Sequence, residues 1–199
     1  MALAIAYGGT ATYASIMRDH APGTFHGPTG PATVSLSALV EWHTMWFRYV
    51  TGDTGATTLG PGRGVFTPDE FAHMADVRQV FVAFRLTAAA AAIVGVGLVL
   101  RGARRRTAVG LIRAAALIAA VGVAAIVIVA GVAFDPLFLL FHEVFFPQGN
   151  FLFPADSNLL AVYPDEYWYG VTLRIGSTFA GAMALIALAA TATLRQARR

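Results

Sequence analysis

Cysteine and lysine are absent from this chain of 199 residues, and charged residues of either sign are scarce. Without cysteine the chain can form no disulfide framework, no thiolate nucleophile and no thiolate-ligated metal site. Charged residues make up 13% of the chain, whereas a soluble domain averages about a quarter. With 57% hydrophobic residues and a mean hydropathy of +0.63, the composition excludes a disordered chain and disfavours an ordinary soluble domain.

Three long apolar segments, at about 80–100, 108–134 and 171–194, are each long enough to cross a bilayer, which takes about 20 residues. A shorter Ala-rich segment at about 1–19 lacks the basic start of a signal peptide. We expect it to form a first transmembrane helix whose N-terminal end is short or truncated. An interfacial helix is the alternative.

The arginines predict the topology. Four of them fill the loop at 101–106, and three follow the last apolar segment at 195–199, so both sites should be cytoplasmic by the positive-inside rule. The segments 20–79 and 135–170 then form an extracellular cap, and both termini lie in the cytoplasm. The net charge of +3 therefore marks a membrane face and does not indicate a nucleic-acid partner.

The expected fold is thus all-α: a single multi-pass membrane domain over 1–199, built as a four-helix bundle with an aromatic-rich extracellular cap. Within the cap we expect a helix over Leu36–Val50 and a second helix that Thr67 caps and Pro68 begins. The segment Phe138–Tyr169 is rich in aromatic residues, which collect at membrane interfaces. We expect it to pack against the membrane surface.

Two of the five histidines stand out, because each lies near a predicted membrane boundary on the outer side. His73 precedes Asp76 by three residues, so a helix would place both on one face, where the carboxylate could orient the ring. His142 is followed by Glu143 in a Phe-rich stretch, where burial would favour its neutral, proton-accepting form. A structural role for either histidine alone is the alternative.

Arg85 and Arg174 lie inside apolar sequence near the predicted outer face. An ionisable group at such a depth is costly and indicates function. The guanidinium groups could hold phosphate, an ester carbonyl or a peptide backbone. Alternatively, they pair with a carboxylate such as Asp76, Asp135 or Glu166.

Several common catalytic signatures are missing: a Gly-x-Ser-x-Gly elbow, a His-Glu-x-x-His zinc motif and a phosphate-binding Walker loop. Two histidines could ligate a haem or a metal, but Asp76 and Glu143 are poorly spaced to complete a metal site. No metal and no cofactor is therefore expected.

Three stretches resemble motifs of the lipoprotein intramolecular transacylase family. They are EFAHMADVR at 70–78, FHEVFFPQGNFLF at 141–153 and LLAVYPDEYW at 159–168. The resemblance implies a four-helix membrane bundle with an extracellular cap and two catalytic histidines, which fall on His73 and His142. It implies an enzyme that moves the sn-2 acyl chain of a diacylated lipoprotein onto the amino group of the same molecule's N-terminal cysteine.

That reaction needs a base and an acid but no acyl-enzyme. We expect His142 to be the base and His73, oriented by Asp76, to be its partner; the reverse assignment is the alternative. The substrate-binding residues expected beside the two histidines are Asp76, Arg85, Phe145, Phe146, Asn150, Glu166, Trp168 and Arg174.

Two other functions remain open at this point. The chain could be a non-enzymatic membrane protein of the same fold whose cap binds lipid or a partner, or a haem- or metal-binding membrane subunit. The leading interpretation is a bacterial acyltransferase of the cell membrane, with a diacylated lipoprotein and membrane lipid as partners.

Overall fold

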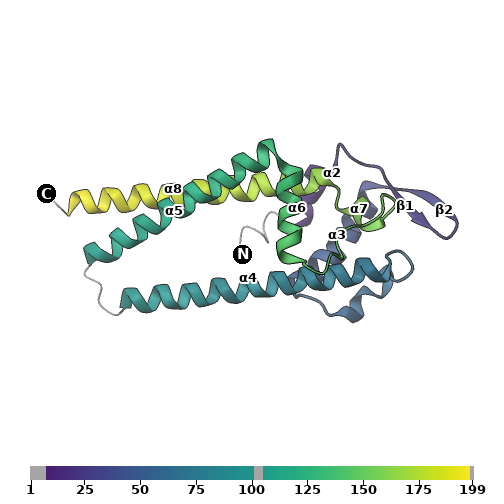
Figure 1. Cartoon of the computed structure of the whole chain (residues 1–199), viewed down its shortest axis with the longest axis horizontal. Helices are drawn as coiled ribbons and strands as arrows, with labels where there is room; N and C mark the ends of the chain where they lie inside the picture. Colours follow the sequence, from purple (N-terminus) through teal and green to yellow (C-terminus); the bar gives the residue numbers. More distant parts are fainter. Residues whose placement is uncertain (1–7, 101–104, 198–199) are drawn as a thin grey trace. The chain divides into compact units, whose positions relative to one another are not determined.

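The computed structural model describes residues 8–100 and 105–197, and most of them are helical (Figure 1). The chain divides into two compact units. The first comprises the chain up to Arg85 together with Asp135–Val171, and the second comprises Leu86–Phe134 and the chain from Thr172 onward. The long helices α4 (Pro68–Leu100) and α8 (Asp165–Gln196) contribute to both units.

Three helices of the described part are long and apolar enough to cross a membrane, as predicted: α4, α5 (Arg105–Val132) and α8. Within the second unit α5 and α8 pack closely at Gly176, because a side-chain carbon there would lie 2.3 Å from Val127. Both α4 and α8 begin before the apolar segments from which they were predicted.

The predicted first transmembrane helix lies partly outside the described residues, which begin at Gly8. Its described part, α2 (Thr10–Met17), has 8 residues, and its Tyr13 and Met17 are buried. Tyr13 donates a hydrogen bond to the Val162 carbonyl at 2.7 Å. The described part of α2 is therefore anchored within the first unit, and the fourth membrane crossing stays a prediction.

The first unit also contains α3 (Leu36–Thr51), the short 3-10 helix η1 (Ala56–Gly62), α6 (Phe134–Phe145) and α7 (Asn158–Val162). The predicted helix over Leu36–Val50 is confirmed. Ser35 caps its start, accepting a hydrogen bond from the Ala38 amide, and Gly52 ends it in the left-handed conformation with φ of 87°.

The prediction of an all-α fold is wrong in one place. Strands β1 (Gly23–Gly27) and β2 (Gly30–Val34) form an antiparallel hairpin (Figure 1). The Asn158 side chain, far along the chain, accepts from the His26 amide at 2.7 Å and donates to the His26 carbonyl at 3.0 Å. Because this support is tertiary, the Gly- and Pro-rich local sequence gave no sign of it.

Candidate functional site

His73 lies one turn into α4, and a capping box fixes where that helix begins. The Thr67 hydroxyl accepts from the Glu70 amide at 3.2 Å, while the Glu70 carboxylate accepts from the Thr67 amide at 2.6 Å. The predicted cap at Thr67 is therefore confirmed. Glu70 is buried, and its carboxylate also accepts from the Ser157 hydroxyl and the Leu159 amide. The first turn of α4 is thereby tied to the start of α7.

His142 lies on α6, and its ring faces that of His73. The ring centroids are 6.0 Å apart and the planes differ by 22°. Phe146 is buried and contacts both rings, with centroids 4.8 Å from His73 and 5.4 Å from His142. Phe153 lies 5.5 Å from His73 on another side. The two histidines that the sequence singled out are therefore brought together inside an aromatic enclosure.

The backbone of α6 sets the tautomer of His142. Its Nδ1 lies 2.8 Å from the Phe138 carbonyl oxygen, which can only accept, so Nδ1 carries the proton of the neutral ring. Nε2 is left with a lone pair. Burial lowers the pKa of His142 below its ordinary value, so the ring is neutral at pH 7. His142 therefore presents a proton-accepting nitrogen.

His73 is buried, and its Nδ1 has no hydrogen-bond partner among the described residues. The Asn150 side chain is a hydrogen-bonding neighbour of the ring. Asn150 in turn donates to the Asp76 carboxylate at 2.7 Å. The sequence predicted that Asp76 orients His73 from one helix turn away; in the structure the hydrogen-bonded link between them runs through Asn150.

Gln148 is a further polar residue at the site, and it was not predicted as one. Its amide donates to Asp76 at 2.8 Å and to the Asn150 oxygen at 3.2 Å. Gln148 lies within the motif at 141–153, which was the only signal for it. The buried pair of Glu70 and Ser157 was also missed, because its two members are far apart in the sequence.

The other predicted substrate-binding residues take different positions. Phe145 is partly exposed and packs on Phe84 at 5.6 Å. Trp168 is half-buried and contacts Phe138, the residue whose carbonyl holds His142, at 6.2 Å. Glu166 is exposed in the first turn of α8. The structure thus links Trp168, but not Glu166, to the neighbourhood of the histidines.

The two arginines inside apolar sequence differ. Arg85 donates to the Thr51 carbonyl at 2.7 Å, at the C-terminal end of α3, where the helix dipole favours a cation. This backbone contact replaces the predicted pairing with a carboxylate. Arg174 is exposed and belongs to the second unit, so it is not part of the cluster described in the first.

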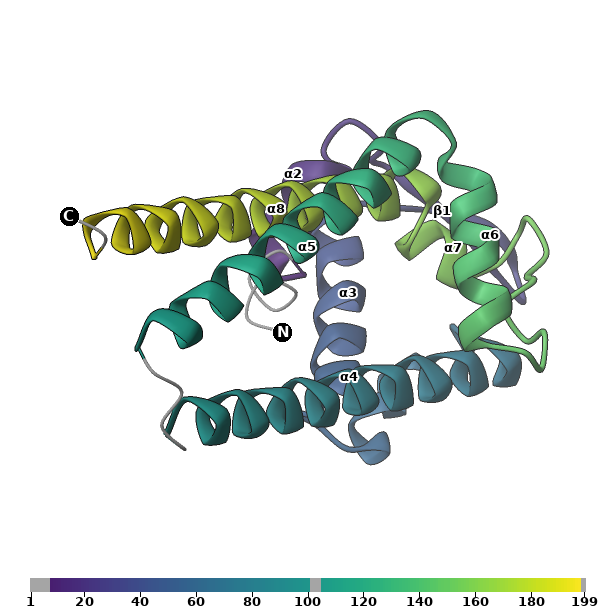
Figure 2. The same cartoon turned by 60° about the vertical axis from the view of Figure 1, so that its left-hand side comes forward.

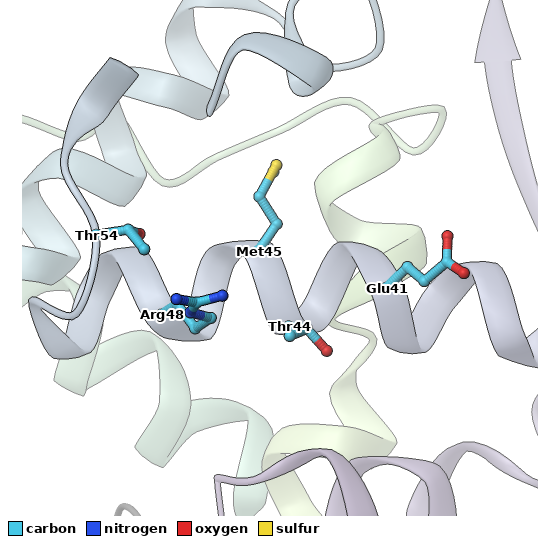
Figure 3. Close-up of a pocket in the computed structure, with 5 residues that line it drawn as sticks. All are labelled: Glu41, Thr44, Met45, Arg48 and Thr54. Atoms are coloured by element: carbon cyan, nitrogen blue, oxygen red, sulfur yellow. The ribbon is translucent and has the colours of Figure 1, made fainter. Parts of the chain in front are cut away.

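A separate pocket lies along α3. It is lined by Glu41, Thr44, Met45 and Arg48 from that helix and by Thr54 from the loop that follows (Figure 3). None of the residues predicted from the sequence as site residues lines it. Among the described residues, no three histidine, aspartate or glutamate side chains gather in a geometry that could hold a metal ion.

One of the comparisons with known proteins agrees with the resemblance of the motifs, and the others found no match. No curated protein and no solved structure matches the chain. Residues 32–168 match the family model described as lipoprotein intramolecular transacylase Lit, and this span covers more than half of the chain and includes both histidines. The chain therefore belongs to the lipoprotein intramolecular transacylase family, a family of acyltransferases.

Proposed function

We propose that this membrane protein moves the sn-2 acyl chain of a diacylated lipoprotein to the amino group of that lipoprotein's N-terminal cysteine, with His142 and His73 as the acid-base pair. The observation that carries the proposal is the geometry of the pair. The two imidazole rings face each other at 6.0 Å, and Nε2 of His142 has no partner among the described residues and is available to accept a proton.

The proton balance of the reaction suits two acceptor groups. An ammonium nitrogen loses one proton before it attacks the ester carbonyl carbon and a second proton as the amide forms. The bond from that carbon to the glyceryl oxygen breaks, and the oxygen takes up one proton, so one proton leaves to water. In the proposal His142 removes the first proton, and His73 passes the second from nitrogen to the glyceryl oxygen.

The surroundings of the pair support a role in orientation. Asn150 and Asp76 hold the His73 ring from one side, and Phe146 packs against both rings. An intramolecular transfer gains mainly from bringing its two reacting ends together, so rigidly held groups fit it well. The remaining predicted contacts, from Arg85, Phe145, Glu166, Trp168 and Arg174 to the substrate, form part of the proposal.

The proposal includes a topology. The arginine clusters at 101–106 and 195–199 place both termini in the cytoplasm by the positive-inside rule, with four crossings if 1–19 forms the first. Segments 20–79 and 135–170 then lie outside. The histidine pair would face the side on which mature lipoproteins are anchored.

The test uses two synthetic diacylated lipopeptides with N-terminal cysteine, one with deuterated acyl chains and a longer peptide. The purified protein is incubated with both together, and tandem mass spectrometry locates each acyl chain. We expect each peptide to gain its own chain as an amide and to lose it from the sn-2 position. Unchanged ester positions, or labels exchanged between the peptides, would refute the proposal.

A further inference from the structure

Helix α6 is apolar on most of its surface, yet none of its residues is buried within the part of the chain that the structure describes. Leu140 and Val144 have exposed fractions of 55% and 63%. An exposed apolar surface of this kind is typical of a helix that contacts a membrane or another protein. Among the described residues of its own unit, nothing covers this side of α6.

The place of α6 in the chain indicates which environment covers it. The chain passes from α5, a candidate membrane span, into α6 with only Ala133 between them. At the other end of α6, Phe145 packs on Phe84 of α4, where that span is already exposed and apolar. The C-terminal end of α6 accordingly lies beside the first half of α4 (Figure 2). Twelve residues make a helix of about 18 Å, too short to cross a bilayer.

Residues four apart share a face of a helix, and α6 divides into four such rows. One row ends in His142 and faces the site, and the next contains Asp135, Leu139 and Glu143. The other two rows are apolar: Leu140 and Val144 follow Pro136, and Phe141 and Phe145 follow Leu137. The row with Asp135 and Glu143 thus lies on a different side of the helix from the two apolar rows. Helices that lie in a membrane interface have such a division.

We propose that α6 is an interfacial helix whose surface of Leu140, Val144, Phe141 and Phe145 contacts the acyl chains of bilayer lipids, with Glu143 at the headgroups. Leu152, with an exposed fraction of 76%, extends this surface beyond the helix. The row that contains Phe141 and Phe145 adjoins the row that contains His142. Combined with the proposed function, on which this last step rests, an acyl chain would reach the histidines from within the bilayer across these two rings.

The absence of cysteine makes a direct depth measurement possible. Single variants Leu140→Cys, Val144→Cys and Glu143→Cys are labelled with a nitroxide and reconstituted in vesicles of phosphatidylcholine and phosphatidylglycerol. Ile93→Cys, on the exposed part of α4, is the control for lipid, and Thr33→Cys, exposed on the hairpin, is the control for water. Electron paramagnetic resonance then compares the collision rates of each label with oxygen and with a water-soluble nickel complex.

We expect the labels at 140 and 144 to favour oxygen as strongly as that at 93, and the label at 143 to give an intermediate ratio. Ratios at 140 and 144 equal to that at 33 would overturn the proposal, because these positions would be in water. Protection from both reagents would also overturn it, since another protein copy would cover the helix. Acyl transfer by the unlabelled variants is measured separately, so loss of the proposed function leaves the depth result standing.

Discussion

The first unit holds two histidine sites that use their ring nitrogens differently. At the first site, Nε2 of His43 donates to the Gly8 carbonyl at 2.8 Å, and Nδ1 accepts from the Tyr163 hydroxyl 3.2 Å away. The ring also stacks on Tyr13, with centroids 4.1 Å apart and planes within 7°. Every polar atom of this ring is satisfied, which is the usual state of a buried polar side chain.

At the second site only Nδ1 of His142 and one nitrogen of His73 have partners among the described residues. The unpartnered Nδ1 of His73 is buried and lowers stability, whereas the proposed function uses such a nitrogen to carry a proton. Burial alone does not separate the two sites, since His43 and His73 are both buried. They differ in whether the second ring nitrogen has a partner, and the proposed function assigns the chemistry to the site where it has none.

Removal of the proposed base should have the strongest effect on the rate. His142→Phe keeps an aromatic ring between Phe138 and Phe146 but has no base. We expect the initial rate of amide formation to fall by about 10²- to 10⁴-fold, while the melting temperature in detergent stays within a few degrees. A rate within threefold of the unchanged enzyme would show that His142 is not the base.

The matched substitution His43→Phe should have the opposite effect. It keeps the stacking on Tyr13 but leaves the Gly8 carbonyl and the Tyr163 hydroxyl buried without partners, which costs about 1–3 kcal/mol. We expect a lower melting temperature in detergent and an unchanged transfer rate per folded enzyme. A lost rate with unchanged stability would remove the distinction between the two sites.

Asn150→Ala removes the link between Asp76 and His73. We expect kcat to fall about tenfold, the equivalent of about 1.4 kcal/mol, with KM unchanged. Gln148→Ala is the control, because this substitution leaves the hydrogen bond from Asn150 to Asp76 in place. The kcat of Gln148→Ala should fall less than that of Asn150→Ala. A rise in KM without a change in kcat would indicate that Asn150 binds substrate, as the sequence predicted.

The pH dependence of the rate tests the protonation state of His142. Burial lowers the pKa of His142 from its ordinary value of 6.5. The ring therefore stays neutral down to a pH below 6.5, and the rate should stay constant over the same range. It should then decline as the pH falls further. A rate measured in vesicles that already declines between pH 8 and 7 would contradict a buried neutral base.

The smallest expected effect is on the acid side of the stability profile. Burial lowers the pKa of His43 to about 4 in the folded protein from 6.5 when exposed. The fold favours the neutral ring, so this contribution to stability is complete above pH 6.5 and is lost as the pH falls toward 4. His43→Phe should flatten the decline of the melting temperature over that range. An unchanged slope would assign the decline to other groups.

Local sequence patterns sufficed for features that depend on neighbouring residues. Hydropathy predicted the three long apolar helices, and the order Thr67-Pro68 predicted the start of α4. The motifs at 70–78, 141–153 and 159–168 together predicted the family that the comparison confirms. Each of these features depends on residues within one helix or one continuous motif.

The features that the sequence did not predict depend on contacts between distant segments. Asn158 holds the hairpin at His26, which is 132 residues away in the sequence, and Asn150 binds Asp76, which is 74 residues away. Arg85 binds the carbonyl that ends α3, a backbone contact that the sequence did not predict. No periodicity in the sequence encodes such pairs, because the turns that bring them together lie elsewhere in the chain.

In the proposed function the partly unpaired histidines perform acyl transfer and the fully paired one does not. The decisive measurement is mass spectrometry of a diacylated lipopeptide that has been incubated in vesicles with equal amounts of folded His142→Phe or His43→Phe. We expect the N-acylated product with a free sn-2 hydroxyl from His43→Phe, and from His142→Phe only a trace in the same time. Equal yields from the two variants, or product from His142→Phe alone, would contradict it.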